Sequence, residues 1–315
     1  MFNSFKELEG GVLNRKWIFK SRNDYEFHGH AIKEYLVSKQ TQFQFVEIVD
    51  TYNYGKVLIL DGVPQSSEYD EFIYHEALVH PVLCAHSNPK DVLIIGGGEG
   101  AVLREVLKHA FVEHVSMVDI DKELIDICRQ YLTSWHCYSF DNSRAKIFFE
   151  DGRQYLRSHK HAFDCIILDL SDPFEGSPAN GLFTFEFYNL VKEALKGDGV
   201  ISLQAESGAL LHSDAHRRIV HTLSSVFQNV FPYYVHVPLY ATYYGFVICG
   251  NENLTKESLV SDKITNILSD RKVHDLRFYD AETARGLFSI PLYLRQRNDR
   301  GVKSITDSDP LMLLP

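Results

Sequence analysis

The chain has 315 residues, 45% of them hydrophobic and 23% charged, which is enough apolar material for one large domain and a smaller one. Its 32 basic and 42 acidic residues leave a net charge of −10, which argues against a nucleic-acid binder and suits cationic small molecules. The five cysteines form no CxxC motif, and no apolar run resembles a signal core or could cross a bilayer, so we expect a cytoplasmic protein rather than a secreted or membrane-spanning one.

Residues 1–68 are predicted to form a small antiparallel β domain. Apolar and polar residues alternate through Phe43, Phe45 and Ile48, as is typical of a half-buried strand. A short apolar strand at 57–60 follows, and Asp61-Gly62 predicts the turn that ends it.

Residues 69–297 are predicted to form a Rossmann-like domain, with a mostly parallel sheet covered by helices on both faces. It opens with a helix at 70–86 that carries a stripe of buried apolar residues and that we expect Pro81 to kink or split. Strands rich in Val, Ile and Leu then alternate with amphipathic helices, and a closing pair of strands follows at 229–250. Residues 298–315 form a tail with no predicted structure.

A glycine loop, Gly96–Ala101, joins the first strand of this domain to its helix, where glycines allow a ligand to approach the backbone. Glu99 lies inside the loop and would repel a pyrophosphate, so the loop predicts an adenosine-containing cation of the S-adenosyl sulfonium kind. Asp119, Asp151 and Asp169 end the next three strands. Together with Glu99 they would form an acidic entrance to the ligand site.

Two of the acids have a purely structural alternative. Asp119 alone could cap the following helix, and Asp172 alone could belong to an Asp-Pro turn that ends the strand before it. The residues that follow, PFEGSPANG, are rich in turn formers and predict a lid over the site. His212 and His216 have i, i+4 spacing without an HExxH motif, so we interpret them as solvated surface histidines and predict no metal site.

From about Phe27 to Arg295 the sequence resembles the polyamine aminopropyltransferases, that is, spermidine synthase and its spermine and thermospermine relatives. The resemblance is carried, in order, by QFQFVEI, YGKVLILDGVPQ, YDEFIYHEALVHP, VLIIGGGEGAVLREVLKH, VDID, EDG, LDLSDP, LFTFEFY, LQAES, HVPLY and GLFSIPLYLR. It implies a co-substrate, decarboxylated S-adenosylmethionine, with no permanently bound cofactor. It also implies a small-molecule polyamine acceptor and a homodimer built partly through the N-terminal sheet.

The resemblance also implies roles for individual residues. Asp169 would be the base that accepts the proton of the attacking amine, Tyr74 would hold that amine, and Asp172 would bind the far ammonium of the acceptor. The residues implied to bind the co-substrate are Gln44, Leu60, Gly96, Gly98, Glu99, Asp119, Asp151, Gly152 and Pro178. Those implied to line the acceptor channel are His75, Glu99, Gln204 and Tyr240.

These motifs define the amine acceptor less clearly than the transfer reaction. Leu170 and a long lid containing Glu175 resemble thermospermine synthases and agmatine-using relatives, whereas QAES at 204–207 and Tyr240 resemble putrescine-using enzymes. We favour putrescine, giving spermidine, with spermidine or agmatine as the alternative acceptor. A methyltransferase on the same fold is a more distant alternative, against which Glu99 argues, because it would repel the methionine carboxylate.

Overall fold

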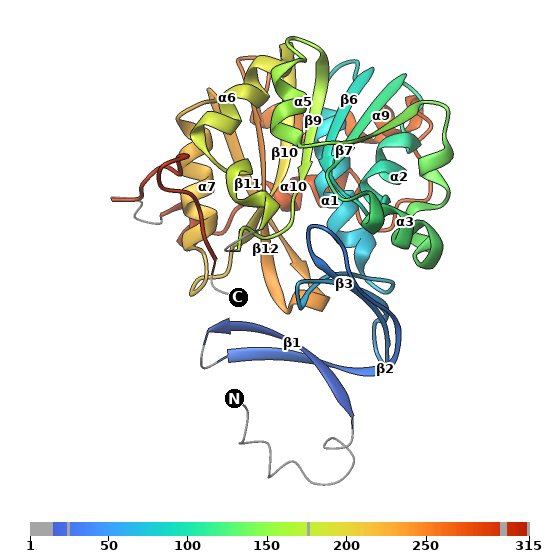
Figure 1. The fold of residues 1–315 in the computed structure, drawn as a ribbon. Coiled ribbons are helices and arrows are strands. Elements are labelled where there is room, and N and C mark those ends of the chain that lie inside the picture. Colours follow the sequence, from blue (N-terminus) through green and yellow to red (C-terminus); the bar gives the residue numbers. More distant parts are fainter. Residues whose placement is uncertain (1–14, 24–25, 175–176, 297–300, 314–315) are drawn as a thin grey trace.

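The computed structural model describes residues 15–23, 26–174, 177–296 and 301–313. Figure 1 shows a small N-terminal sheet packed below a larger α/β domain. The small sheet is an antiparallel meander in the order β1-β2-β3-β4-β5. Its strands are β1 (Lys16–Asn23), β2 (Glu26–Gln40), β3 (Phe45–Thr51), β4 (Gly55–Leu60) and β5 (Val63–Ser67).

The larger sheet has the order β11-β12-β10-β9-β6-β7-β8, and its five strands from β10 to β8 run parallel. Strand β6 pairs with β7 on one side and β9 on the other, so the strand order reverses at β6 and opens a crevice beyond its carboxyl end. These strands are β6 (Asp91–Gly96), β7 (His114–Asp119), β8 (Ala145–Phe149), β9 (Phe163–Asp169), β10 (Leu195–Ser207), β11 (Asn229–Val237) and β12 (Thr242–Gly250).

Helices cover both faces of this sheet (Figure 1), which confirms the predicted Rossmann-like architecture. They are α1 (Glu71–Ala85), α2 (Ala101–Lys108), α3 (Lys122–Tyr131), α4 (Thr133–His136), α5 (Gly152–Arg157), α6 (Phe185–Ala194), α7 (Asp214–Ser224), α8 (Lys256–Leu259), α9 (Ile264–Asp270), α10 (Ala281–Leu287) and α11 (Leu292–Arg295). Within the described residues, no helix is both long and apolar enough to span a membrane.

Helix α1 runs without a break through Pro81, so the prediction that this proline splits the helix was wrong. A helical proline deprives the carbonyl four residues earlier of its N–H partner. Here the Tyr233 hydroxyl on β11 donates to that carbonyl, on Ala77, at 2.7 Å. The Ser202 hydroxyl on β10 likewise donates to the carbonyl of Leu78 at 2.7 Å. These two side chains satisfy the helix backbone around the proline.

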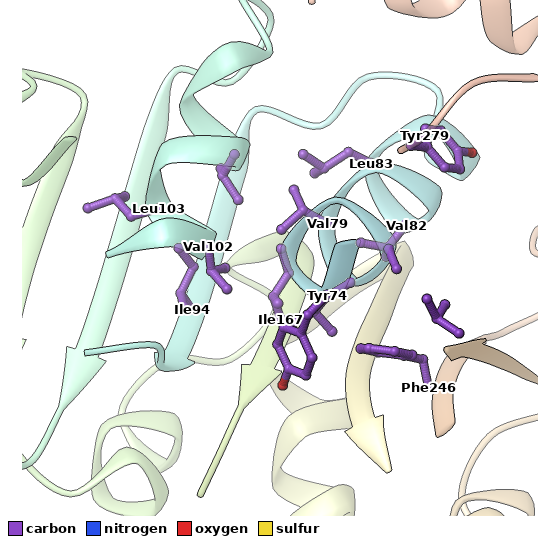
Figure 2. Close-up of a cluster of buried hydrophobic side chains, with 14 of the residues drawn as sticks. Tyr74, Val79, Val82, Leu83, Ile94, Val102, Leu103, Ile167, Phe246 and Tyr279 are labelled. Atoms are coloured by element: carbon purple, nitrogen blue, oxygen red, sulfur yellow. The ribbon is translucent and has the colours of Figure 1, made fainter. Parts of the chain in front are cut away.

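The core around α1 fixes the position of the site. Figure 2 shows Tyr74, Val79 and Val82 of this helix among side chains from the sheet and from α2, including Ile167 and Phe246. Twelve residues of α1 are buried, so the helix is enclosed on most sides rather than along the single predicted stripe.

The C-terminal tail is folded onto the larger α/β domain over residues 301–313, where no structure was predicted. Ile305 and Leu311 are buried in the core cluster that includes α6 and α7. The Arg153 guanidinium binds both carboxylate oxygens of Asp307, at 2.9 and 2.5 Å. Leu313 forms a parallel bridge with Phe174, so the tail lies beside the start of the predicted lid.

Candidate active site

A cleft of about 950 Å³, measured out to its open mouth, lies at the carboxyl ends of β6 to β9. The predicted site residues that line it are Gln44, Leu60, Tyr74, Gly96, Gly98, Glu99, Asp119, Asp151, Gly152, Asp169, Asp172, Pro178 and Tyr240. Residues from the N-terminal sheet therefore form one wall, and the strand ends form the floor.

Asp169 ends β9 and is held from two sides. Its backbone carbonyl accepts a 3.0 Å hydrogen bond from the Gly97 N–H, and its Oδ1 accepts one of 2.7 Å from the Tyr74 hydroxyl on α1. Gly96 has a φ of +83°, and a Cβ at that position would lie 2.0 Å from the Asp169 carbonyl oxygen. Only glycine permits this close approach of the loop to the strand end.

Burial raises the pKa of Asp169 to about 6, and repulsion from Glu99 adds to this shift. The positive charge of His75 and the hydrogen bond from Tyr74 act in the opposite direction. A carboxylate with a pKa just below neutral is ionised at pH 7 and is still basic enough to accept a proton efficiently. Asp169 therefore has the electrostatic character of a general base.

Glu99 is connected to a buried histidine. His75 Nε2 lies 3.0 Å from Glu99 Oε1, and His75 Nδ1 lies 2.8 Å from Glu71 Oε2. Burial alone would lower the pKa of His75, but hydrogen bonds to the two carboxylates raise it to about 10. His75 is fully buried and is absent from the cleft lining, so the structure places it behind Glu99.

Asp119 lies at the end of β7, and its Oδ1 accepts a 2.8 Å hydrogen bond from the Asp121 N–H. The helix cap considered for Asp119 is instead supplied by Asp121, which accepts from the Leu124 N–H at the start of α3. Asp121 also accepts a hydrogen bond from Gln44 and thereby holds that side chain at the cleft. Burial raises the pKa of Asp119 to about 7.

Asp151 and Gly152 begin helix α5 on the opposite wall. Asp151 Oδ1 caps the helix by accepting from the Gln154 N–H at 2.8 Å. A Cβ on Gly152 would lie 2.5 Å from the Ile95 side chain, so this wall requires glycine. Pro178 begins a short 3₁₀ helix, Pro178–Leu182, that borders the cleft. Glu175 of the predicted lid lies outside the described residues.

Comparison with known proteins identifies the family of the chain. Residues 71–258 match the spermine/spermidine synthase domain, and residues 16–68 match the spermidine synthase tetramerisation domain. The chain belongs to the spermine/spermidine synthase family. A polyamine aminopropyltransferase from Sulfurisphaera tokodaii is 40% identical over 295 residues, which are 94% of this chain and 97% of that protein. Polyamine aminopropyltransferase 2 from Hyperthermus butylicus is 41% identical over 280 residues, covering 89% and 91% of the two chains.

Solved structures of this family have the same fold. A spermidine synthase in complex with the transition-state analogue AdoDATO superposes with a TM-score of 0.80 at 31% identity, covering 92% of this chain and 98% of that one. Spermidine synthase from Thermotoga maritima gives a TM-score of 0.79 at 31% identity and covers 93% and 98%. The predicted family, fold and class of enzyme, an aminopropyl-group transferase, are confirmed.

Gln204 lies beneath the cleft of this synthase-family protein rather than in its lining. Its Nε2 donates to the Leu170 carbonyl at 2.9 Å, and its Oε1 accepts from the Tyr244 hydroxyl at 2.9 Å. Gln204 thus orients Tyr244, which does line the cleft. Sequence analysis missed Tyr244, because it lies in the closing pair of strands among many aromatic residues that pack the sheet. It also missed Gln65, whose carbonyl accepts from the Tyr240 hydroxyl.

The histidines do not behave as predicted for a solvated surface. His216 is buried, with its Nδ1 2.7 Å from the Ala205 carbonyl and its Nε2 3.1 Å from the Tyr234 hydroxyl. Its i, i+4 partner His212 instead lies 3.0 Å from Glu26 of β2. The interpretation of His216 as a surface residue was wrong, because strand β11 covers the helix there.

Three ligand-type side chains, on His75, Glu99 and Asp169, lie within 4.8 Å of one another. Both ring nitrogens of His75 face carboxylates, so both carry protons and neither offers a lone pair to a cation. His75 and Glu99 therefore form an ion pair beside Asp169.

Proposed function

We propose that the enzyme transfers the aminopropyl group of decarboxylated S-adenosylmethionine to putrescine, giving spermidine and methylthioadenosine. The observation that carries this proposal is the half-buried Asp169, hydrogen-bonded to Tyr74, at the floor of a cleft lined by further carboxylates. Both substrates carry positive charge, and a cleft lined by several carboxylates favours cations over anions. Family membership supports the same chemistry.

The chemical step follows from the position of Asp169. An alkyl amine has a pKa near 10 and arrives as an ammonium ion, so it must lose a proton before it can attack. Asp169 accepts that proton while Tyr74, bonded to Oδ1, keeps the carboxylate oriented. The free amine forms a C–N bond to the propyl methylene, the C–S bond breaks, and its electron pair leaves on sulfur. Because methylthioadenosine is a neutral thioether, its departure needs no acid.

In this proposal the donor occupies the side of the cleft nearest β7 and β8. Asp119 binds the ribose hydroxyls, while Asp151 and Gly152 border the adenine. Gln44, Leu60, Gly96, Gly98 and Pro178 complete the nucleoside site. Glu99 binds the ammonium of the aminopropyl chain, and the same charge repels the carboxylate that the undecarboxylated donor retains. This repulsion favours aminopropyl transfer over methyl transfer.

The acceptor occupies the side nearest β10 and β12. We propose that Asp172 binds its distal ammonium and that Tyr240 lines the channel beside Tyr244. Asp172 is only 8% exposed, so its charge lies in a site where ion pairing is poorly screened by water. The aromatic rings of Tyr240 and Tyr244 suit the hydrocarbon chain of an alkyl diamine such as putrescine.

Product analysis tests the proposal. The protein is incubated with decarboxylated S-adenosylmethionine and, separately, with putrescine, cadaverine, agmatine or spermidine, and products are identified by mass spectrometry. The proposal predicts the highest kcat/KM for putrescine. Preference for spermidine or agmatine would overturn the acceptor assignment. Methylated products from S-adenosylmethionine, without aminopropyl transfer, would overturn the function.

We also propose that the subunits associate through the N-terminal sheet, as a cytoplasmic homodimer. The match of residues 16–68 to a tetramerisation domain supports association through this sheet. Phe19 and Phe27, in edge-to-face contact on the β1–β2 hairpin, are 40% and 46% exposed and offer an apolar surface. Analytical ultracentrifugation of the whole chain would measure the stoichiometry, and a monomer at micromolar concentration would contradict the proposal.

A further inference from the structure

We propose that Arg104 and Glu71 are positioning residues for Glu99, acting through His75, which serves as a fixed buried cation rather than as a ligand of the acceptor. This inference rests on the proposed function, because it assigns to Glu99 the recognition of the donor ammonium. The inference also goes beyond the proposed function, because neither Arg104 nor Glu71 lines the cleft.

The hydrogen bonds of His75 define its charge. Its Nδ1 faces Glu71 Oε2 at 2.8 Å and its Nε2 faces Glu99 Oε1 at 3.0 Å, and the ring is inaccessible to solvent. An ionised carboxylate can only accept a hydrogen bond, so each ring nitrogen must donate one. A neutral imidazole has a single donor, and therefore this ring is an imidazolium. With both donors used and no exposed surface, it has nothing left to offer an acceptor amine.

Arg104 fixes the end of this row of hydrogen-bonded side chains that is farthest from the cleft. Its Nη1 donates to Glu71 Oε1 at 3.0 Å and its Nη2 to Glu71 Oε2 at 2.9 Å, a two-pronged pair that holds the carboxylate in one plane. Its Nε donates to Glu105 Oε1 at 2.7 Å, and Nη1 also reaches the Trp135 carbonyl at 2.5 Å. The guanidinium is thus locked to α1, α2 and α4 at once.

Charge alternates along the resulting row: Arg104, Glu71, His75, Glu99. Because Glu71 is ionised and held in place, the imidazolium is stabilised and its Nε2–H is aimed at Glu99. Glu99 is thereby fixed by one oxygen at the cleft wall, which orients the carboxylate toward the donor ammonium. The same imidazolium lowers the pKa of Asp169, so the row also keeps the base ionised at neutral pH.

Other charged or titratable groups share this region and would contribute to any pH profile. They come from α1, α2, the strand ends of β7 and β9, the short helix Pro238–Tyr240 and β12, and they are Tyr74, His80, Glu105, Lys108, Asp119, Asp169, Tyr240 and Tyr244. His80 Nε2 lies 2.8 Å from Glu105, which continues the ion-paired row away from the cleft.

The test uses Arg104→Met and Glu71→Gln, with Arg104→Lys as the conservative variant and Arg129→Met as a matched control. Arg129, on α3, forms an exposed pair with Asp141 and is not part of the row. We expect Arg104→Met and Glu71→Gln to raise KM for the donor about tenfold. This is the change in affinity expected when one partly buried charged hydrogen bond is lost. We expect the Kd of methylthioadenosine, which lacks the ammonium, to stay within about twofold. Arg104→Lys should restore part of the donor affinity.

Two further readouts separate positioning from a general loss of structure. The acid limb of the kcat/KM profile should move to higher pH in Glu71→Gln, because Asp169 loses a neighbouring cation. Nitrogen NMR of His75 should show a doubly protonated ring at pH 8 in the unmodified protein and a neutral one in Glu71→Gln. A neutral His75 at pH 8 in the unmodified protein, or equal weakening of donor and methylthioadenosine, would overturn the inference.

The NMR measurement requires no turnover, so it remains decisive even if the protein proves inactive with the proposed substrates. Absence of aminopropyl transfer by the unmodified protein would reject the proposed function, whereas normal transfer with a neutral His75 would reject this inference alone. If Arg104→Met does not fold, Glu71→Gln carries the test, because the amide keeps the size of the side chain and an acceptor for Nδ1.

Discussion

The Tyr74 hydroxyl donates a 2.7 Å hydrogen bond to Asp169, and this contact joins the first turn of α1 to the end of β9. Tyr74 itself is packed against the rings of Tyr240, Tyr244 and Phe246. The orientation of Asp169 is therefore set by an aromatic cluster that joins α1 to the last strands of the larger domain. The consequence is a half-buried carboxylate that is held at one oxygen and has a pKa raised to about 6.

Activity should follow the ionisation of Asp169. Because burial and Glu99 raise its pKa to about 6, kcat/KM should fall as pH is lowered through about 6, where the carboxylate becomes protonated and can no longer accept a proton. The measurement is a pH profile of kcat/KM for putrescine at saturating donor. An acid limb near the ordinary carboxyl value of about 4 would contradict this electrostatic account.

Removing the Tyr74 hydroxyl should move the acid limb of the kcat/KM profile to higher pH. The hydrogen bond from Tyr74 lowers the pKa of Asp169, so Tyr74→Phe should shift the acid limb to higher pH and reduce kcat by about tenfold. Tyr138→Phe is a suitable control, because Tyr138 is 69% exposed and lies outside the cleft lining. An unchanged acid limb in Tyr74→Phe would show that the hydroxyl does not tune the base.

Glu99 should distinguish two nucleosides that differ by one charged chain. Glu99→Gln should weaken decarboxylated donor binding by about 1–3 kcal/mol, the value of a hydrogen bond to a charged group, and leave methylthioadenosine binding nearly unchanged. Calorimetry with both ligands measures the difference. Equal losses would place Glu99 away from the aminopropyl chain.

The raised pKa of Asp169 should lower the stability of the folded protein at neutral pH. The folded pKa of Asp169, about 6, lies above its unfolded value near 4, so the native state retains a proton that the unfolded chain releases. Stability from this group is therefore lost as pH rises from about 4 to 6. Asp169→Asn should be more stable than the unmodified protein by about 1–3 kcal/mol at pH 7.5, and the difference should vanish near pH 4. Thermal unfolding at both pH values measures this, and a less stable variant at pH 7.5 would contradict it.

Much of the site could be predicted because its acids lie at strand ends. The strand that ends at Asp169 is buried along its length, the strand that ends at Asp119 buries its Val and Met residues, and parallel strands bring their carboxyl ends to one edge of the sheet. The glycine loop is equally local, since Gly96 needs its positive φ to approach Asp169. These features depend on short segments and on the handedness of the crossover.

The remaining features depend on contacts between distant segments. Helix α1 continues through Pro81 because Tyr233, more than 150 residues later, donates to the Ala77 carbonyl. The position of His75 depends on Arg104, whose side chain reaches across from α2 to Glu71. The C-terminal tail was left unassigned because its apolar residues show no helix or strand period, and only tertiary packing buries Ile305 and Leu311.

The central claim is that Asp169 accepts the proton of the attacking amine, and Asp169→Asn tests it most directly. The measurement is the rate of methylthioadenosine release from decarboxylated S-adenosylmethionine and putrescine at saturation, together with the Kd of methylthioadenosine. The account predicts a fall in kcat of about 10²- to 10⁴-fold with the Kd unchanged, because the amide fits the same space but cannot take up the proton. Turnover close to that of the unmodified protein, in a variant that is folded and binds methylthioadenosine, would contradict it.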